Sequence, residues 1–390
     1  METVTFLIYL DAFCNDYVTD KNTPFFYELS KKGYFGKVQT VSGFAQEAAI
    51  MTGKYPDKTD SFTWYRYSPE NSPFRWLRPF RFFKILRRFR VYYPIKVAIR
   101  KITGFVTHRE YQDPAFIPLD ILVLFENASV SLPKHLPTLA SLCQLSKRKC
   151  QELTMVYKSI GSQRCPTLFK PILDSIEDRR PCDVCIVHIG EFDSLGHRFG
   201  PHPERFEDYL NEVDSWIHKL YYSAKQTGLN CNLVITADHA MFDVKGMIDI
   251  ESELKRIPLR VFDDYVYFLD STIARFWFFS DRAKHLVEKK LSEIRHGHTL
   301  SQKEKEEQHI SFKNNTYGDL LFWVDKGYMI FPNFFQAIAS EQLNGMHGYL
   351  NDHDGALIVY SDKQNAKQIV GKAIVPLVEV FDITRTLAGI

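Results

Sequence analysis

Six residues of metal-binding types occur in four widely separated parts of this chain. In chain order they are Asp11, Asp193, His197, Asp238, His239 and His347. Carboxylate oxygen and imidazole nitrogen are ligands that zinc-type divalent cations accept in four-coordinate sites. Three carboxylates and three neutral imidazoles suit two such ions. The four positive charges of two ions exceed the three negative charges, so the set predicts a site that attracts an anion such as a phosphate ester.

Each of the three Asp residues follows an apolar, β-branched run, and these runs predict the elements that position the site. Residues 4–10 precede Asp11, 183–189 precede Asp193, and 232–236 precede Asp238. Such runs are typical of buried parallel strands, and open α/β sheets bind ligands beyond the carboxyl ends of their strands. One helical turn would bring Asp193 beside His197. The predicted fold class is α/β, with a central, mostly parallel sheet flanked by helices and with inserted cap segments.

Each polar segment alone is a weak signal. An Asp–His pair also occurs in surface turns, and an Asp that follows a strand often caps a helix. The order of all the segments, with every Asp after a strand and at domain-scale spacing, favours one shared metal site over these local interpretations.

On these motifs the chain resembles the nucleotide pyrophosphatase/phosphodiesterase branch of the alkaline phosphatase superfamily. The matching segments cover nearly the whole chain: LDAF at 10–13, TPFF at 23–26, TGKYP at 52–56, DSLGHRFGP at 193–201, TADHAM at 236–241, HGY at 347–349 and FDIT at 381–384. The resemblance implies an alkaline-phosphatase-like fold with two divalent ions. It assigns Asp193, His197 and His347 to one ion. It assigns Asp11, Asp238 and His239 to the other, beside a nucleophilic hydroxyl.

The chain departs from the family pattern at that hydroxyl. Counting back from the TG pair at 52–53 by the family's spacing leads to Gly43, which has no side chain. A shift of one residue makes Ser42 the predicted nucleophile, at the start of a helix beginning near Gly43, where backbone N–H groups favour a phosphate. Thr40 is the alternative nucleophile, and Ser42 acting only as a helix cap is the alternative role. Gln46 falls where the family carries an amide that contacts phosphate.

The predicted function is hydrolysis of phosphate esters by two metal ions through a phosphoseryl intermediate. By resemblance, the expected substrates are diesters or pyrophosphates, and the expected enzyme is a phosphodiesterase or nucleotide pyrophosphatase. Zinc is the expected metal, with manganese as the alternative. A phosphomonoesterase or phosphomutase with the same site is a second interpretation. A catalytically silent metal- and ligand-binding protein is a third, because Gly43 stands at the nucleophile position.

Composition is typical of a globular enzyme that acts on small phosphate esters. The 390 residues are 45% hydrophobic and 25% charged, and a net charge of +2 gives no general attraction to nucleic acid. Specific nucleic-acid binding is therefore not expected. No apolar run approaches the roughly 18 residues of a membrane span. Because there is no secretion signal at the N-terminus and the seven cysteines are scattered, we expect reduced thiols and a cytoplasmic location.

Two insertions are predicted within a metallo-hydrolase core of residues 1–65, 140–255 and 345–390. Residues 66–139 form the first, and its part from 66 to 101 combines many Arg and Lys residues with interleaved aromatic residues. Three interpretations stay open: a surface that contacts an anionic membrane, a positive lid over a polyanionic substrate, or a solvated segment that packs its aromatic residues on the core. Residues 256–344 form the second, a small α+β cap subdomain.

Overall fold

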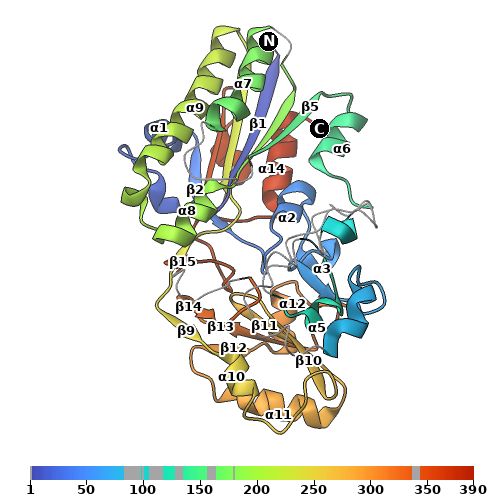
Figure 1. The fold of residues 1–390 in the computed structure, drawn as a ribbon. Coiled ribbons are helices and arrows are strands. Elements are labelled where there is room, and N and C mark those ends of the chain that lie inside the picture. Colours follow the sequence, from blue (N-terminus) through green and yellow to red (C-terminus); the bar gives the residue numbers. More distant parts are fainter. Residues whose placement is uncertain are drawn as a thin grey trace.

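The computed structural model describes residues 2–82, 98, 101–104, 117–127, 135–155, 164–178, 181–335 and 343–390. These residues form a helix-flanked sheet that carries both chain ends and, at the other end of the molecule, a smaller sheet (Figure 1). None of the helices in these ranges has the length and apolar character that a membrane crossing requires.

The large sheet has seven strands. Their order across the sheet is β17 (Ile374–Pro376), β2 (Tyr34–Gln39), β16 (Gly355–Ser361), β7 (Asn230–Ala237), β1 (Thr3–Leu10), β6 (Val184–Ile189) and β5 (Cys150–Met155). Only β16 runs antiparallel to its neighbours, and the other adjacent pairs are parallel. The prediction of a mostly parallel α/β sheet is therefore confirmed. The three predicted strands before the Asp residues are β1, β6 and β7, side by side at the centre.

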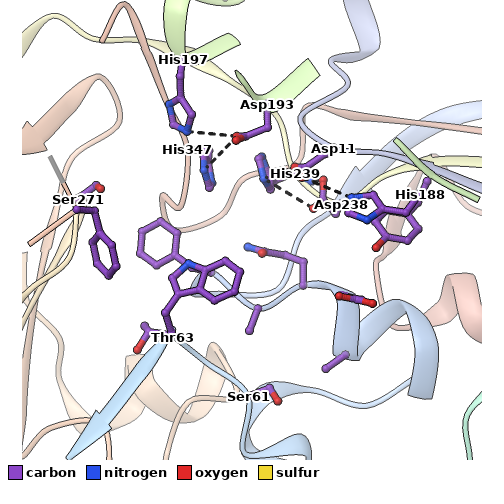
Figure 2. A pocket seen from close by; sticks show the side chains of 18 of the residues that line it. Asp11, Ser61, Thr63, His188, Asp193, His197, Asp238, His239, Ser271 and His347 are labelled. Carbon is purple, nitrogen blue, oxygen red and sulfur yellow. Dashed lines mark hydrogen bonds and ion pairs between the residues drawn. The ribbon is translucent and has the colours of Figure 1, made fainter. Parts of the chain in front are cut away.

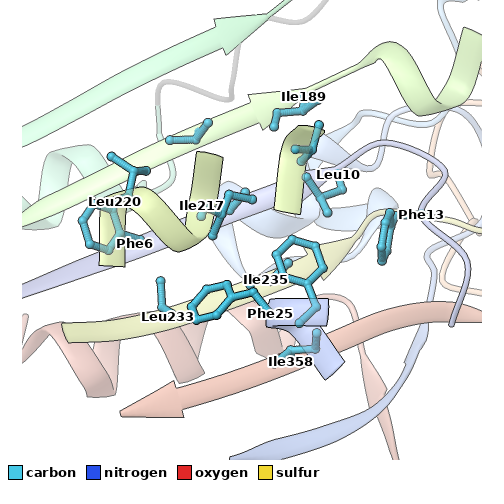
Figure 3. Close-up of a cluster of buried hydrophobic side chains, with 14 of the residues drawn as sticks. Phe6, Leu10, Phe13, Phe25, Ile189, Ile217, Leu220, Leu233, Ile235 and Ile358 are labelled. Carbon is cyan, nitrogen blue, oxygen red and sulfur yellow. The ribbon is translucent and has the colours of Figure 1, made fainter. Parts of the chain in front are cut away.

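Helices cover both faces of this sheet. One face carries α1 (Pro24–Lys32), α7 (Arg164–Glu177) and α9 (Glu207–Gln226), and the other carries α2 (Glu47–Thr52), α6 (Leu139–Leu145), α13 (Ala366–Val370) and α14 (Glu379–Ala388). Side chains alternate along β1, so this strand serves both layers. Phe6, Ile8 and Leu10 pack with the first group of helices, whereas Leu7 and Tyr9 pack with the second. Figure 3 shows the first layer, in which α1 and α9 meet strands β1, β6, β7 and β16.

The smaller sheet is antiparallel and lies in the predicted cap region. Its strand order is β10 (Tyr265–Leu269), β11 (Ile273–Phe278), β13 (Leu320–Val324) and β12 (Gly297–Thr299). Helices α10 (Ile250–Leu254) and α11 (Asp281–Ser292) share its hydrophobic core, and α12 (Gln302–Glu307) follows β12. The spacing of apolar residues over 281–295 predicts a helix, and residues 320–331 predict two strands about a turn. Helix α11 and strands β13 and β14 (Tyr328–Ile330) confirm these predictions, and β14 pairs with β9 (Gly246–Ile248). The domain boundaries themselves stay predictions.

Parts of the first insertion pack onto the cap sheet. A short ribbon of β3 (Tyr65–Tyr67) and β4 (Phe125–Asn127), together with α5 (Leu119–Leu122), joins the core of the cap sheet. A fully buried ion pair fixes the junction, because Arg275 on β11 binds Asp270 and also donates to the Tyr65 carbonyl oxygen. Residues 75–82 form the 3-10 helix η2 (Arg75–Phe82). The sequence also predicts a helix from about residue 80 to 91, between two prolines. Most of that range lies outside the described residues, so the role of the basic segment stays a prediction.

The remaining short elements connect these layers. They are η1 (Asn15–Tyr17), α3 (Pro56–Thr59), α8 (Glu191–Phe199), η4 (Pro203–Arg205), and the pair β8 (Phe242–Asp243) with β15 (Gly345–Met346). Helix α8 begins directly after β6, and β15 leads into His347. These two connections bring the predicted site residues to one edge of the large sheet.

Candidate two-metal site

The six predicted ligand residues converge at the carboxyl edge of the large sheet. Asp11 directly follows β1, and Asp238 and His239 directly follow β7. Asp193 and His197 lie on α8, one helical turn apart, as their spacing predicts. His347 follows β15 and completes the cluster (Figure 2). Because β1, β6 and β7 are neighbours and parallel, their ends deliver these side chains to one place.

One group of donors consists of Asp11, Asp238 and His239. One ligand atom from each lies within 4.8 Å of the other two. His239 Nε2 is 3.1 Å from Asp11 Oδ1 and 3.8 Å from Asp238 Oδ2. Asp238 Oδ1 accepts hydrogen bonds from the backbone N–H groups of Ala12 and His239, so that carboxylate is held in one orientation and Oδ2 faces the imidazole.

A second group surrounds the Asp193 carboxylate and shares His239 with the first. Ligand atoms of Asp193, His239 and His347 also lie within 4.8 Å of one another. Asp193 Oδ1 is 3.4 Å from His347 Nε2 and 3.3 Å from His197 Nε2. The rings of His239 and His347 stack with 3.8 Å between their centroids. The structure therefore brings together all six residues, with His239 positioned between the two groups. Their metal-binding roles stay predictions.

The surroundings of these donors fit divalent cations. His197 Nδ1 lies 2.9 Å from the Gly345 carbonyl oxygen, and His239 Nδ1 lies 3.1 Å from the Ala240 carbonyl oxygen. Such bonds fix the tautomer in which Nε2 is free to bind a metal. Among the described residues, Asp193 Oδ1 and His347 Nδ1 are buried without a hydrogen-bond partner. Buried polar atoms seldom remain unpaired, so the unpaired Asp193 Oδ1, which lies between the imidazoles of His197 and His347, fits a bound cation.

Burial, and after it the crowding of like charges, shifts the pKa values of Asp238 and His347 in the cluster. Burial raises the pKa of Asp238 to about 7, and the neighbouring Asp11 carboxylate adds to the shift. Burial lowers the pKa of His347 well below its usual range, with His239 and His197 adding to that effect. A bound divalent cation would suit both groups, because it stabilises ionised carboxylates and binds neutral imidazoles.

The structure does not bring the predicted nucleophile into this cluster. The prediction of a helix beginning near Gly43 is wrong, because α2 begins at Glu47 with Gln46 at its N-cap. Ser42 therefore caps no helix, and its Oγ donates to Gln308 Oε1 at 2.7 Å. Thr40 Oγ1 donates to the Asp238 carbonyl oxygen at 2.6 Å. Neither hydroxyl residue is among those that line the pocket at the cluster.

A pocket of about 310 Å³ opens beside the cluster, between the large sheet and the cap. Gln46 lines it, and its Nε2 donates to the Gly43 carbonyl oxygen at 2.7 Å, so its phosphate contact stays a prediction. Sequence reasoning missed several other residues of the lining, namely Tyr9, Phe44, Glu47, Trp64, His188 and Ser271. His188 carried a signal, since it is a polar residue near the carboxyl end of a predicted buried strand.

The comparison with protein families agrees with this site. The family described as type I phosphodiesterase / nucleotide pyrophosphatase matches residues 131–350, which is more than half of the chain and includes five of the six clustered residues. The sixth, Asp11, lies ahead of the matched region. This protein belongs to the type I phosphodiesterase / nucleotide pyrophosphatase family.

Curated proteins that this chain resembles include ectonucleotide pyrophosphatase/phosphodiesterase family member 7 from rat, mouse and human. The Rattus norvegicus protein is 35% identical over 86 residues, which is 21% of this chain and 20% of that protein. The Mus musculus protein is 27% identical over 183 residues, covering 43% of this chain and 39% of that protein. The chain thus spans at most about two fifths of the length of these relatives.

Solved structures extend the likeness to the whole fold. Human ectonucleotide pyrophosphatase / phosphodiesterase 5 matches with a TM-score of 0.67 and 16% sequence identity, over 100% of this chain and 95% of that chain. An inactive variant of the murine protein in complex with AMP matches with a TM-score of 0.65 and 16% identity, over 100% and 96% of the two chains. The alkaline-phosphatase-like fold that the resemblance implies is therefore confirmed.

Proposed function

We propose that this protein hydrolyses phosphodiesters or pyrophosphates with the help of two divalent metal ions, of which zinc is the first candidate and manganese the second. The observation that carries the proposal is the pair of overlapping donor groups, Asp11 with Asp238 and His239, and Asp193 with His239 and His347. Family membership supports the reaction class. The AMP complex of the murine relative supports a nucleotide ester as substrate.

The residues of the site have distinct tasks in this reaction. The Asp and His groups would hold two ions, and bound ions would offset the negative charge of the phosphoryl oxygens during an in-line displacement. The pocket has the size range of small-molecule sites, and its wall beyond the cluster carries Phe44, Trp64 and Phe335. These aromatic side chains would bind the organic part of the ester and exclude water from it.

A hydrolysis assay with and without metal tests the proposal. The purified protein, after chelation and after addition of zinc or manganese, is given bis(p-nitrophenyl) phosphate and p-nitrophenyl phosphate. We expect metal-dependent release of nitrophenol, faster from the diester than from the monoester. Binding of metal and AMP without turnover of any phosphate ester would contradict the proposal and favour the catalytically silent binding protein, which the lack of a side chain at Gly43 permits.

Two histidines offer a matched pair of variants for the same assay. His197→Ala removes an imidazole 3.3 Å from Asp193, and we expect loss of bound metal and of turnover. His202→Ala removes an exposed imidazole that lies 2.9 Å from Asp243 outside the cluster, and we expect metal content and turnover to persist. Equal metal content in both variants would refute the assignment of His197.

Three parts of this proposal rest on the sequence alone. They are a cytoplasmic location, contact of the basic segment with anionic membranes, and the absence of specific nucleic-acid binding. Sedimentation with anionic vesicles, and its weakening by salt, would test the membrane contact.

A further inference from the structure

The backbone at the expected nucleophile position has no room for a side chain. Gly43 has a φ of +103°, a conformation that residues with a Cβ rarely adopt. A Cβ placed there would lie 2.2 Å from the Phe62 carbonyl oxygen and 2.6 Å from Phe62 Cδ2. The Phe44 N–H donates to the same carbonyl oxygen at 2.7 Å, which fixes this approach of the two segments. The fold thus excludes a hydroxyl side chain at residue 43.

The hydroxyl groups nearest in sequence are engaged elsewhere. Ser42 Oγ donates to Gln308 Oε1, and Gln308 Nε2 donates in turn to Asn351 Oδ1 at 3.0 Å, so the amide is locked with its oxygen toward Ser42. Two hydrogen bonds fix Thr40: its N–H donates to the Asp352 carbonyl oxygen, and its Oγ1 donates to the Asp238 carbonyl oxygen. Neither residue lines the pocket.

The Ser and Thr residues that do line the pocket are Ser61, Thr63 and Ser271. Figure 2 shows all three away from Asp11 and Asp238, across the pocket from the cluster. Thr63 Oγ1 is further engaged, since it donates to the Tyr65 carbonyl oxygen at 3.1 Å. Among the described residues that line the pocket, no Ser or Thr hydroxyl therefore lies next to the donor group where the family places its nucleophile.

The pocket contains a carboxylate, that of Glu47, rather than such a hydroxyl. Glu47, the first residue of α2, lines the same pocket as Asp11 and Asp238 and is partly buried. Within the described ranges, its carboxylate has no hydrogen-bond or ion-pair partner. A half-buried carboxylate without a partner costs free energy, so a catalytic task is a physical reason for its presence.

The charges around Glu47 suit a proton acceptor. Burial raises its pKa, and the His188 imidazole on β6 opposes that shift. The Glu152 carboxylate on β5 and the Asp11 carboxylate, which follows β1, add to the shift. A raised pKa makes a carboxylate a stronger base at the pH where it is still ionised.

We infer that this chain cleaves its ester in one in-line displacement by water, with Glu47 as the catalytic base and without a covalent phospho-enzyme. The water oxygen forms a bond to phosphorus while the bond from phosphorus to the leaving oxygen breaks, and that electron pair stays on the leaving oxygen. The Glu47 carboxylate takes the proton from water and later releases it to solvent. This inference rests on the proposed function.

The configuration at phosphorus decides between the two routes. A single displacement inverts phosphorus, whereas two successive displacements through a phospho-enzyme retain its configuration. The wild-type, metal-loaded protein is given one diastereomer of the p-nitrophenyl ester of adenosine 5′-phosphorothioate in ¹⁸O-labelled water. We expect inversion in the labelled product. Retention would overturn this inference and leave the proposed hydrolase intact, whereas no turnover of any ester would overturn both.

Substitution of Glu47 tests the base. Glu47→Gln keeps the shape of the side chain, and we expect kcat to fall by about 100-fold while metal content stays unchanged. Added formate should partly restore turnover in Glu47→Ala, because a small carboxylate can occupy the vacated space. Glu152→Gln is the control, since it removes a nearby negative charge outside the pocket lining, and we expect an effect within about threefold. Turnover of Glu47→Gln within threefold of wild type, or a phosphorylated peptide in the quenched enzyme, would overturn the inference.

Discussion

Replacing Asp270 by Asn should destabilise the protein more than any exposed charge change. Asp270 and Arg275 are both fully buried, with Arg275 Nε 2.6 Å from Asp270 Oδ2. Burial raises the pKa of Asp270 to about 6 although Arg275 opposes the shift, so attraction does not fully offset desolvation. Removing the negative charge leaves the guanidinium buried without a counter-charge. Such a change costs about 3–5 kcal/mol of folding free energy.

The same reasoning predicts that removing both charges costs less. A pKa of about 6 against the usual 3.8 corresponds to roughly 3 kcal/mol spent on keeping Asp270 ionised, which a neutral pair would not require. The double variant Asp270→Asn, Arg275→Met still loses the donor to the Tyr65 carbonyl oxygen, a loss of about 1–3 kcal/mol. We therefore expect the double variant to be more stable than Asp270→Asn alone.

Urea unfolding followed by circular dichroism, at fixed metal concentration, measures these differences. The matched control is Asp263→Asn, which breaks an exposed pair in which Arg260 Nε lies 3.2 Å from Asp263 Oδ2. We expect that control to cost less than about 1 kcal/mol. A loss below 1 kcal/mol for Asp270→Asn, or a double variant less stable than the single one, would refute the account of this pair.

Three further predictions concern the site and its support. Asp238→Asn should lose one of two bound ions by elemental analysis, because this carboxylate belongs to only one donor group; two retained ions would contradict the assignment. Gly43→Ala should lower the urea midpoint of unfolding more than Gly228→Ala does. Both glycines have positive φ, but of the two only Gly43 has neighbouring atoms within 4 Å of the added Cβ. Equal decreases in the midpoint would contradict the steric argument. Asp214 accepts hydrogen bonds from the Phe25 and Phe26 N–H groups, and burial raises its pKa from the usual 3.8 to about 6. Its contribution to stability is therefore greatest below pH 3.8 and falls by roughly 3 kcal/mol as the pH rises from 3.8 to 6. Urea unfolding of wild type and Asp214→Asn from pH 4 to 7 should show this difference, and a constant difference would contradict it.

The sequence predicted what depends on local pattern. Asp11 and Asp238 follow apolar runs that became β1 and β7, and parallel neighbours deliver their ends to one edge. The start of α2 was predicted four residues too early, because the loop through Gly43 is set by the hydrogen bond from Phe44 to Phe62, a contact that spacing within the motif does not reveal. Glu47 was missed for the same reason, since the shifted helix start decides which side chain faces the pocket.

The cap helps to position His347, a candidate metal ligand, and also forms part of the pocket wall. The Gly348 carbonyl oxygen, one residue after His347, accepts hydrogen bonds from Thr272 Oγ1 and Trp323 Nε1, both at 2.9 Å. Thr272 immediately precedes β11 and Trp323 lies on β13, so the cap sheet holds the loop that positions this imidazole. The large sheet positions Asp11, Asp238 and His239 through its own strand ends. A site assembled in this way is complete only when the cap is docked, so we expect a rigid cap junction to be a condition for binding both ions.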